Sequence, residues 1–127
     1  IVLSIDVKAS GDGWRVFLNG GRIQTEIDPV EWAKQGVELG VGEILLTSIT
    51  ADGTKAGFDL KLTRAVSTTV SVPVVASGGA GTLEDFAAVF IGGMADAALA
   101  ASVFHYRQIA IPDLKNFLNS WSIEVRI

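Results

Sequence analysis

A serine- and glycine-rich turn after a short apolar segment has the residue types of a phosphate-binding site. Val74 to Ala76 is apolar and rich in β-branched residues, which is typical of a strand buried on both faces, and Ser77-Gly78-Gly79-Ala80-Gly81 follows it directly. Thr82 and, three residues later, Asp85 are typical of a capped helix start. The backbone N–H groups of such a turn and the partial positive charge of a helix N-terminus favour an anionic ligand. The alternative is that the glycines only form a tight turn.

A second turn of small residues supports the same ligand. Ala100-Ala101-Ser102 follows another apolar strand-like segment, Ala97 to Leu99. In (β/α)8 barrels the loops after the seventh and eighth strands frequently bind one phosphate together. We therefore expect a phosphate site between the turn after Ser77 and the turn at Ala101.

An aspartate follows the first strand-like segment. Ile1 to Ile5 is typical of a buried parallel strand, and Asp6 comes at its end. Catalytic groups of barrels lie at the carboxyl ends of the strands, so Asp6 is a candidate acid or base. The alternative is an aspartate that only caps a helix or closes a turn.

Four strand–helix units must position these residues. Apolar strands are expected at residues 1–5, 44–46, 74–76 and 97–99, and helices at residues 28–40, 59–66, 82–91 and 112–118. The turn signal Asn19-Gly20 predicts a small hairpin insertion near residues 11–26, which could act as a lid. The alternation predicts an α/β fold with a parallel sheet, namely a (βα)4 half of a (β/α)8 TIM barrel, in a single domain over residues 1–127.

A half-barrel is incomplete as a fold. It leaves two bare sheet edges and one uncovered sheet face, which would be the barrel interior. The chain also opens directly on a strand pattern, which indicates a piece of a longer protein. We therefore expect it to associate with an N-terminal half-barrel or with a second copy of itself.

Composition excludes several other classes of protein. The 127 residues are 49% hydrophobic and 19% charged, which is typical of a globular domain. The net charge of −4 argues against nucleic acid as a partner but not against a phosphorylated metabolite. With no cysteine and no cluster at metal-ligand spacing, neither a disulfide nor a metal site is expected. No apolar run reaches membrane-spanning length and no leader pattern is present, so we expect a soluble, cytoplasmic protein with no membrane partner.

Six segments of the chain form a specific combination: Ser4 to Asp6, Gly42 to Ser48, Asp52 to Lys55, Gly57 to Asp59, Ala76 to Gly79, and Ala95 to His105. Together they resemble the cyclase subunit of imidazole glycerol phosphate synthase, from histidine biosynthesis. The resemblance extends over the whole chain and corresponds to the C-terminal half of that family.

The resemblance implies a lyase that converts ammonia and PRFAR, a bis-phosphorylated formimino ribonucleotide, to imidazole glycerol phosphate and AICAR. No cofactor is expected. In the family two aspartates on opposite strands act as acid and base; one matches Asp6, and the other belongs to the missing N-terminal half. The isolated half is therefore expected to have little or no turnover unless it forms a homodimer, which would present Asp6 twice.

The resemblance also assigns binding residues. Thr47, Asp52 and Gly53 match residues that line the substrate. Glu43 matches one member of a charged gate on the opposite barrel face, where ammonia enters from a partner glutaminase. The phosphate cradle is matched by Ser77, Gly78, Gly79, Ala101 and Ser102.

Three residues depart from the family pattern. Thr50 stands in place of an acid, Glu26 stands in place of a glycine, and Met94 is an extra residue beside the second phosphate turn. Two other functions stay open: a phosphate-binding structural half-barrel that self-associates without useful turnover, and the related phosphoribosyl isomerase of the same pathway. The segment Leu45 to Ser48 favours the cyclase.

Overall fold

A single six-stranded sheet organises the chain in the computed structural model, which describes residues 1–127. The spatial order of the strands is β3-β2-β1-β4-β5-β6. The strands are β1 (Val2–Ser10), β2 (Gly13–Leu18), β3 (Ile23–Gln24), β4 (Glu43–Ser48), β5 (Val74–Ser77) and β6 (Ala97–Leu99). The helices are α1 (Pro29–Glu38), α2 (Leu60–Ser67), α3 (Leu83–Ile91), α4 (Ser102–His105) and α5 (Ile111–Ser120).

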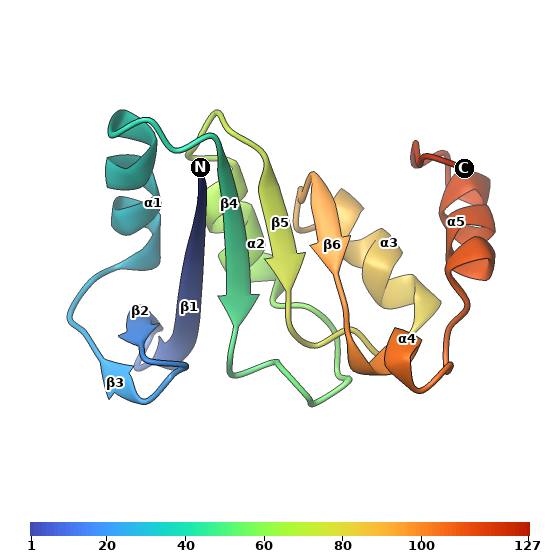
Figure 1. Ribbon diagram of the computed structural model, residues 1–127, viewed down its shortest axis with the longest axis horizontal. Coiled ribbons are helices and arrows are strands. Elements are labelled where there is room, and N and C mark those ends of the chain that lie inside the picture. The colour runs from blue at the N-terminus through green and yellow to red at the C-terminus, as the bar shows by residue number, and fades with distance from the viewer.

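The four strands β1, β4, β5 and β6 are parallel neighbours, and helices connect each to the next. This is the (βα)4 arrangement of half a TIM barrel, so the predicted fold class is confirmed. In Figure 1 the strands point downward, and the turns that follow β4, β5 and β6 lie along the lower edge. None of the helices combines the length and the apolar character needed to cross a bilayer.

The hydrophobic core lies between the sheet and its helices. Ile5, Leu46 and Ala76 are register partners across β1, β4 and β5, and all three are almost fully buried. Helices α2 and α3 lie behind the sheet in Figure 1, and the face toward the viewer carries no helix. Side chains on that second face, such as Leu45 and Val75, are only half-buried.

The expectation that these strands are buried on both faces is therefore wrong for this chain. The side chains of a strand alternate between the two faces, and the helices of the chain cover only one of them. The apolar residues on the second face, such as Leu45 and Val75, contact one another across the strands, but no helix of the chain covers them. The half-barrel prediction accounts for this pattern, because the uncovered face would be the interior of a complete barrel.

The first strand is longer than the sequence predicts. β1 does not end at Asp6 but continues to Ser10, because its second half pairs antiparallel with β2, with Asp6 opposite Phe17. The parallel pairing of β1 with β4 stops at Val7 opposite Ser48, so Asp6 still lies at the carboxyl end of the parallel region.

The hairpin of β2 and β3 is fixed to the body of the protein at its base and at its turn. Trp14 Nε1 donates a hydrogen bond to Asp59 Oδ2 over 3.3 Å, and Lys8 Nζ donates one to the Gly21 carbonyl over 2.8 Å. Asn19 begins the turn at a φ of 51°. These contacts hold the hairpin as a continuation of the sheet.

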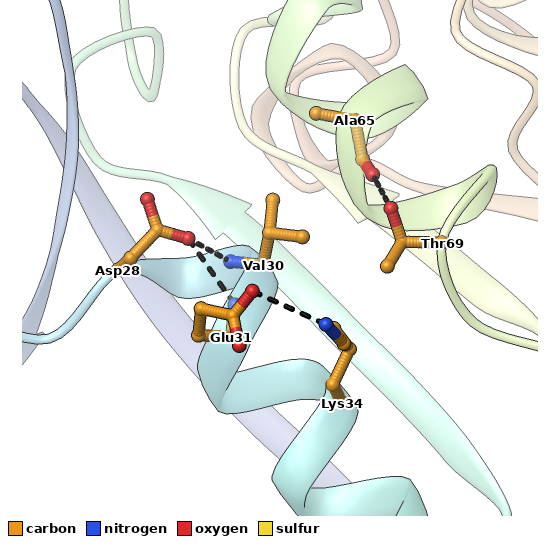
Figure 2. Close-up of polar contacts among 6 residues, drawn as sticks. All are labelled: Asp28, Val30, Glu31, Lys34, Ala65 and Thr69. Atoms are coloured by element: carbon orange, nitrogen blue, oxygen red, sulfur yellow. Dashed lines mark hydrogen bonds and ion pairs between the residues drawn. The ribbon is translucent and has the colours of Figure 1, made fainter.

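The predicted helix starts are present. Asp28 caps α1, as Figure 2 shows, by accepting hydrogen bonds from the N–H groups of Val30 (2.9 Å) and Glu31 (3.1 Å). Thr82 and Asp85 form a capping box at α3, which is the arrangement that their spacing predicts. Short-range side-chain patterns of this kind determine where the helices begin. The helix starts then fix the positions of the preceding turns.

Candidate binding and catalytic site

Asp6, Thr47 and Ser77 form a row across three neighbouring strands. Asp6 is the register partner of Thr47, and Thr47 is the register partner of Ser77. Register partners in a parallel sheet point to the same face, and here it is the face without helices, where all three are half-buried. Adjacent strands lie about 4.8 Å apart, which places the Asp6 and Ser77 backbones about 10 Å apart. A substrate lying on this face could touch all three.

A cavity of about 160 Å³ opens at one end of this row. It lies where the loop after β4 and the turns after β5 and β6 meet, at the carboxyl ends of the strands. Its volume is several times that of one water molecule, so a phosphate group fits. Seven of the predicted site residues line it: Asp52, Gly53, Ser77, Gly78, Gly79, Ala101 and Ser102.

Free backbone N–H groups make this cavity suitable for an anion. The N–H groups of Gly79, Ala80 and Ala101 donate no hydrogen bond within the chain. All three residues line the cavity. Gly79 and Ala80 are buried, and buried backbone donors normally have a partner, so a ligand with acceptor oxygens would satisfy these two groups.

The N-terminus of α3 contributes less than the sequence predicts. Asp85 Oδ2 accepts hydrogen bonds from the N–H groups of both Gly81 and Thr82, each over 2.9 Å. These two donors are therefore occupied by a carboxylate of the chain itself. The anion site depends on the turn that precedes Gly81 and not on the first turn of the helix.

The glycines of the turn also have a packing role. A Cβ on Gly79 would clash with the Gly57 carbonyl, and a Cβ on Gly81 would clash with the Lys55 carbonyl. Gly57 N–H donates to the Gly79 carbonyl over 2.8 Å, so the loop after β4 lies backbone to backbone against the turn after β5. Gly79 has a φ of 107°. The glycines can therefore both form a tight turn and leave backbone N–H groups free for a phosphate.

Two predicted residues lie outside the cavity but near it. Asp6 and Thr47 occupy β1 and β4, on the same sheet face as Ser77. Glu43 is different, because it lies at the opposite end of β4 from Thr47, beside Val2. The structure therefore places Glu43 away from the other predicted residues, at the amino end of the strands.

The acidic residues of the site have no cationic partner in the chain. The one ion pair joins Lys34 and Glu31 on α1, so Asp6, Glu43 and Asp52 have none. No three histidine, cysteine, aspartate or glutamate side chains converge as a metal-binding group.

Four further residues line the cavity: Ala80 and Ala100, which belong to the two predicted phosphate turns, and Lys55 and Leu99, which were not predicted. Leu99 is the register partner of Ser77, which only the strand pairing reveals. Lys55 follows Asp52 by three residues in a polar loop, and the presence of a cation in that loop was a signal for an anion site.

The three residues that depart from the family pattern lie in a loop next to β1 or are exposed to solvent. Thr50 Oγ1 accepts a hydrogen bond from Ala9 N–H over 3.0 Å, just beyond the parallel pairing of β1 and β4. Glu26 is exposed after the hairpin. Met94 is exposed as well and has a φ of 57°, which is unfavourable for a residue with a side chain.

The chain is similar in sequence to proteins of histidine biosynthesis. Residues 1–110 match the family model described as "Histidine biosynthesis protein". The chain is 54% identical to the imidazole glycerol phosphate synthase subunit HisF of Clostridium beijerinckii, with 100% of this chain and 51% of that protein aligned. The corresponding subunit of Wolinella succinogenes is 55% identical, with 100% of this chain and 50% of that protein aligned.

A third relative, the same subunit of Alkaliphilus metalliredigens, is 51% identical, with 99% of this chain and 50% of that protein aligned. The chain thus spans about half the length of the curated relatives it matches. The resemblance drawn from the six sequence segments is confirmed. The chain belongs to the histidine biosynthesis protein family.

Proposed function

We propose that this chain supplies the C-terminal half of a cyclase subunit that converts PRFAR and ammonia to imidazole glycerol phosphate and AICAR. The observation that carries the proposal is the placement of seven expected binding residues around one cavity, beside a row that begins with Asp6. The names of the relatives support the same assignment. As a biosynthetic protein, the chain would act in the cytoplasm.

The cavity would hold one phosphate of the doubly phosphorylated substrate. Free N–H groups at Gly79 and Ala101, with the hydroxyls of Ser77 and Ser102, provide donors for phosphate oxygens. From this anchor the substrate would extend along the uncovered sheet face, past Thr47 to Asp6. Asp52 and Gly53 would line the anchored end.

Asp6 would act as one member of an acid–base pair. Ring closure and C–N cleavage both move protons, and two carboxyl groups on opposite sides of the substrate can donate and accept them. This chain has one such aspartate on its uncovered face. The second aspartate would come from the complementary half of the barrel, so the isolated chain would turn over little substrate.

The partner half would cover the exposed sheet face. We propose that it is an N-terminal half-barrel, or a second copy of this chain when no such half is present. Ammonia from a glutaminase would enter at the amino end of the strands, where Glu43 lies. Cations that complete the gate would come from the partner half, because Glu43 has none in this chain.

Recombination with a partner half tests the proposal. The chain would be mixed with the N-terminal half of the Clostridium beijerinckii subunit, and PRFAR consumption would be followed with ammonium chloride as the nitrogen source. We expect turnover only in the mixture, and loss of that turnover with Asp6→Asn. Asp12→Asn, which changes an exposed aspartate in the hairpin turn, is the matched control. A folded mixed barrel that is inactive, or equally active with Asp6→Asn, would contradict the proposal.

A structural role without turnover is the second candidate. Two features favour it: the uncovered sheet face, on which another half could pack, and the cavity, which this chain forms by itself. Neither feature requires the partner's aspartate. In this case the recombined barrel would bind phosphate but would not consume PRFAR. The same assay therefore separates the two functions.

A further inference from the structure

Lys55 is the one cationic residue among those that line the cavity. The other charged residue there is Asp52, so the lining carries one positive and one negative group. A phosphate monoester carries more than one negative charge at neutral pH and would be repelled by Asp52 alone. A cation beside the cavity offsets that repulsion. The preference of the cavity for an anionic ligand would therefore depend on Lys55.

The Lys55 side chain also crosses between two segments that are far apart in the sequence. Its Nζ donates a hydrogen bond to Gln108 Oε1 over 2.9 Å, 53 residues further along the chain. Gln108 follows α4, the short helix after the second phosphate turn. The contact therefore joins the loop after β4 to the segment beyond β6, and the turn after β5 lies between them.

The backbone of Lys55 is fixed, whereas its side chain is exposed. The carbonyl packs against Gly81, and Lys55 has a φ of 54°. Thr54 next to it is held by a 3.1 Å hydrogen bond from its N–H to the Ala51 carbonyl. An ammonium group has three donors, and Gln108 takes one, so two stay available for phosphate oxygens.

We propose that Lys55 is a cationic clasp for the phosphate group in this cavity, held at the cavity mouth by Gln108. The inference rests on the proposed phosphate site and names a residue that sets its affinity and charge preference. When the phosphate is bound, the ammonium donates to it and keeps its contact with Gln108. The clasp thereby ties the two flanking loops together over the ligand.

Phosphate titrations of the chain test the clasp. Inorganic phosphate is the probe, and the amide NMR signals of Gly79 and Ala101 report binding at the site itself. Lys55→Met keeps an unbranched side chain one atom shorter but removes the charge, and we expect about tenfold weaker binding, as for loss of one charge-assisted hydrogen bond. Lys55→Arg should bind within about threefold of the original chain, because the charge is kept. Lys61→Met removes an exposed lysine on α2 and is the matched control.

Two further measurements distinguish a charge effect from a structural one. Added potassium chloride should weaken phosphate binding more in the original chain than in Lys55→Met, because salt screens the lost interaction. Gln108→Glu should also weaken binding, because the new carboxylate competes for the ammonium and adds a negative charge at the cavity mouth. Thermal unfolding should be the same in all of these variants.

The outcomes separate the clasp from the site. If phosphate shifts no signal at Gly79 or Ala101 in the original chain, both the proposed site and the clasp are wrong. If phosphate binds there but Lys55→Met has the same affinity and salt dependence, the site stands and the clasp is wrong. Weaker binding with reduced salt dependence, restored by Lys55→Arg, supports the clasp.

Discussion

Gly79 lies where two loops touch backbone to backbone, and this contact makes it more than a flexible turn residue. Its φ is 107°, and the Gly57 carbonyl occupies the place where a side chain would begin. We expect Gly79→Ala to lower the free energy of unfolding by about 3 kcal/mol, because backbone strain and steric overlap both contribute. Urea denaturation measures the loss.

Gly53→Ala separates these two contributions. Gly53 has a φ of 75°, but nothing lies within 4 Å of the place where its Cβ would be. Only the backbone strain applies, so the expected loss is about 1 kcal/mol. Equal losses for Gly53→Ala and Gly79→Ala would show that the loop–loop contact does not constrain position 79.

Met94 is a residue at which the chain carries strain without an evident packing reason. Its φ is 57°, its side chain is exposed, and its carbonyl accepts a hydrogen bond from Ser67 Oγ, which any residue could provide. Met94→Gly should raise the free energy of unfolding by about 0.5 kcal/mol, since relief of strain exceeds the added freedom of the unfolded chain. Met94→Ala keeps the strain and should change little in the same urea experiment; an equal gain from alanine would refute the explanation.

At the scale of single elements, α1 shows how a local pattern sets a helix boundary. Figure 2 shows Asp28 bonded to the first free N–H groups of the helix, those of Val30 and Glu31, and the side chain of Glu31 paired with Lys34. Asp28→Ala should reduce the free energy of unfolding by about 1 kcal/mol, because the cap satisfies donors that otherwise have no partner in the helix.

The ion pair on the same helix provides the control. Its oxygen and nitrogen are 3.3 Å apart, but both side chains are largely exposed to solvent. Lys34→Met should therefore change the free energy of unfolding by less than about 0.5 kcal/mol. A loss from Lys34→Met as large as that from Asp28→Ala would mean that the helix depends on the ion pair and not on its cap.

The helix caps and the strand cores could be predicted from the sequence because they depend on residues close together in the chain. Asp28 and Thr82 act on N–H groups two or three residues away, and the apolar runs of β4 and β5 are short and continuous. The extension of β1 to Ser10 could not be predicted in this way, because it depends on pairing with β2.

The part of the candidate site that could be predicted from the sequence is the part formed by turns that directly follow strands. The residues from Ser77 to Gly79 and from Ala101 to Ser102 line one cavity, because parallel strands end at one edge of the sheet. The occupation of the Gly81 N–H by Asp85 and the contact of Lys55 with Gln108 depend on side-chain positions in the folded chain. No spacing in the sequence reveals the second of these contacts.

For the whole molecule, the uncovered sheet face is the feature with the largest consequence. Apolar side chains such as Leu45 and Val75 are half-buried there, and Val2 and Leu99 are exposed at its edges. We expect the isolated chain to self-associate in solution, so that light scattering gives a mass above the 13.4 kDa of one chain.

Val75→Lys tests this expectation, because it places a charge at the centre of the face. The variant should return to the monomer mass while its far-ultraviolet circular dichroism stays the same. Leu39→Lys is the control, since Leu39 is exposed at the end of α1 on the helix side. A monomeric original chain that unfolds cooperatively would contradict the expected self-association.

The row from Asp6 through Thr47 to Ser77 is spaced by the hydrogen bonds of the sheet and not by any loop. A designer could therefore shorten the hairpin of β2 and β3 while the Asp6 carboxylate keeps its position. The loop after β4 is less free to change, because its backbone is bonded to the turn after β5 through Gly57 and Gly79. Under the proposed function, the position of the carboxylate would then be set by the sheet, and the hairpin would be a separate part open to redesign.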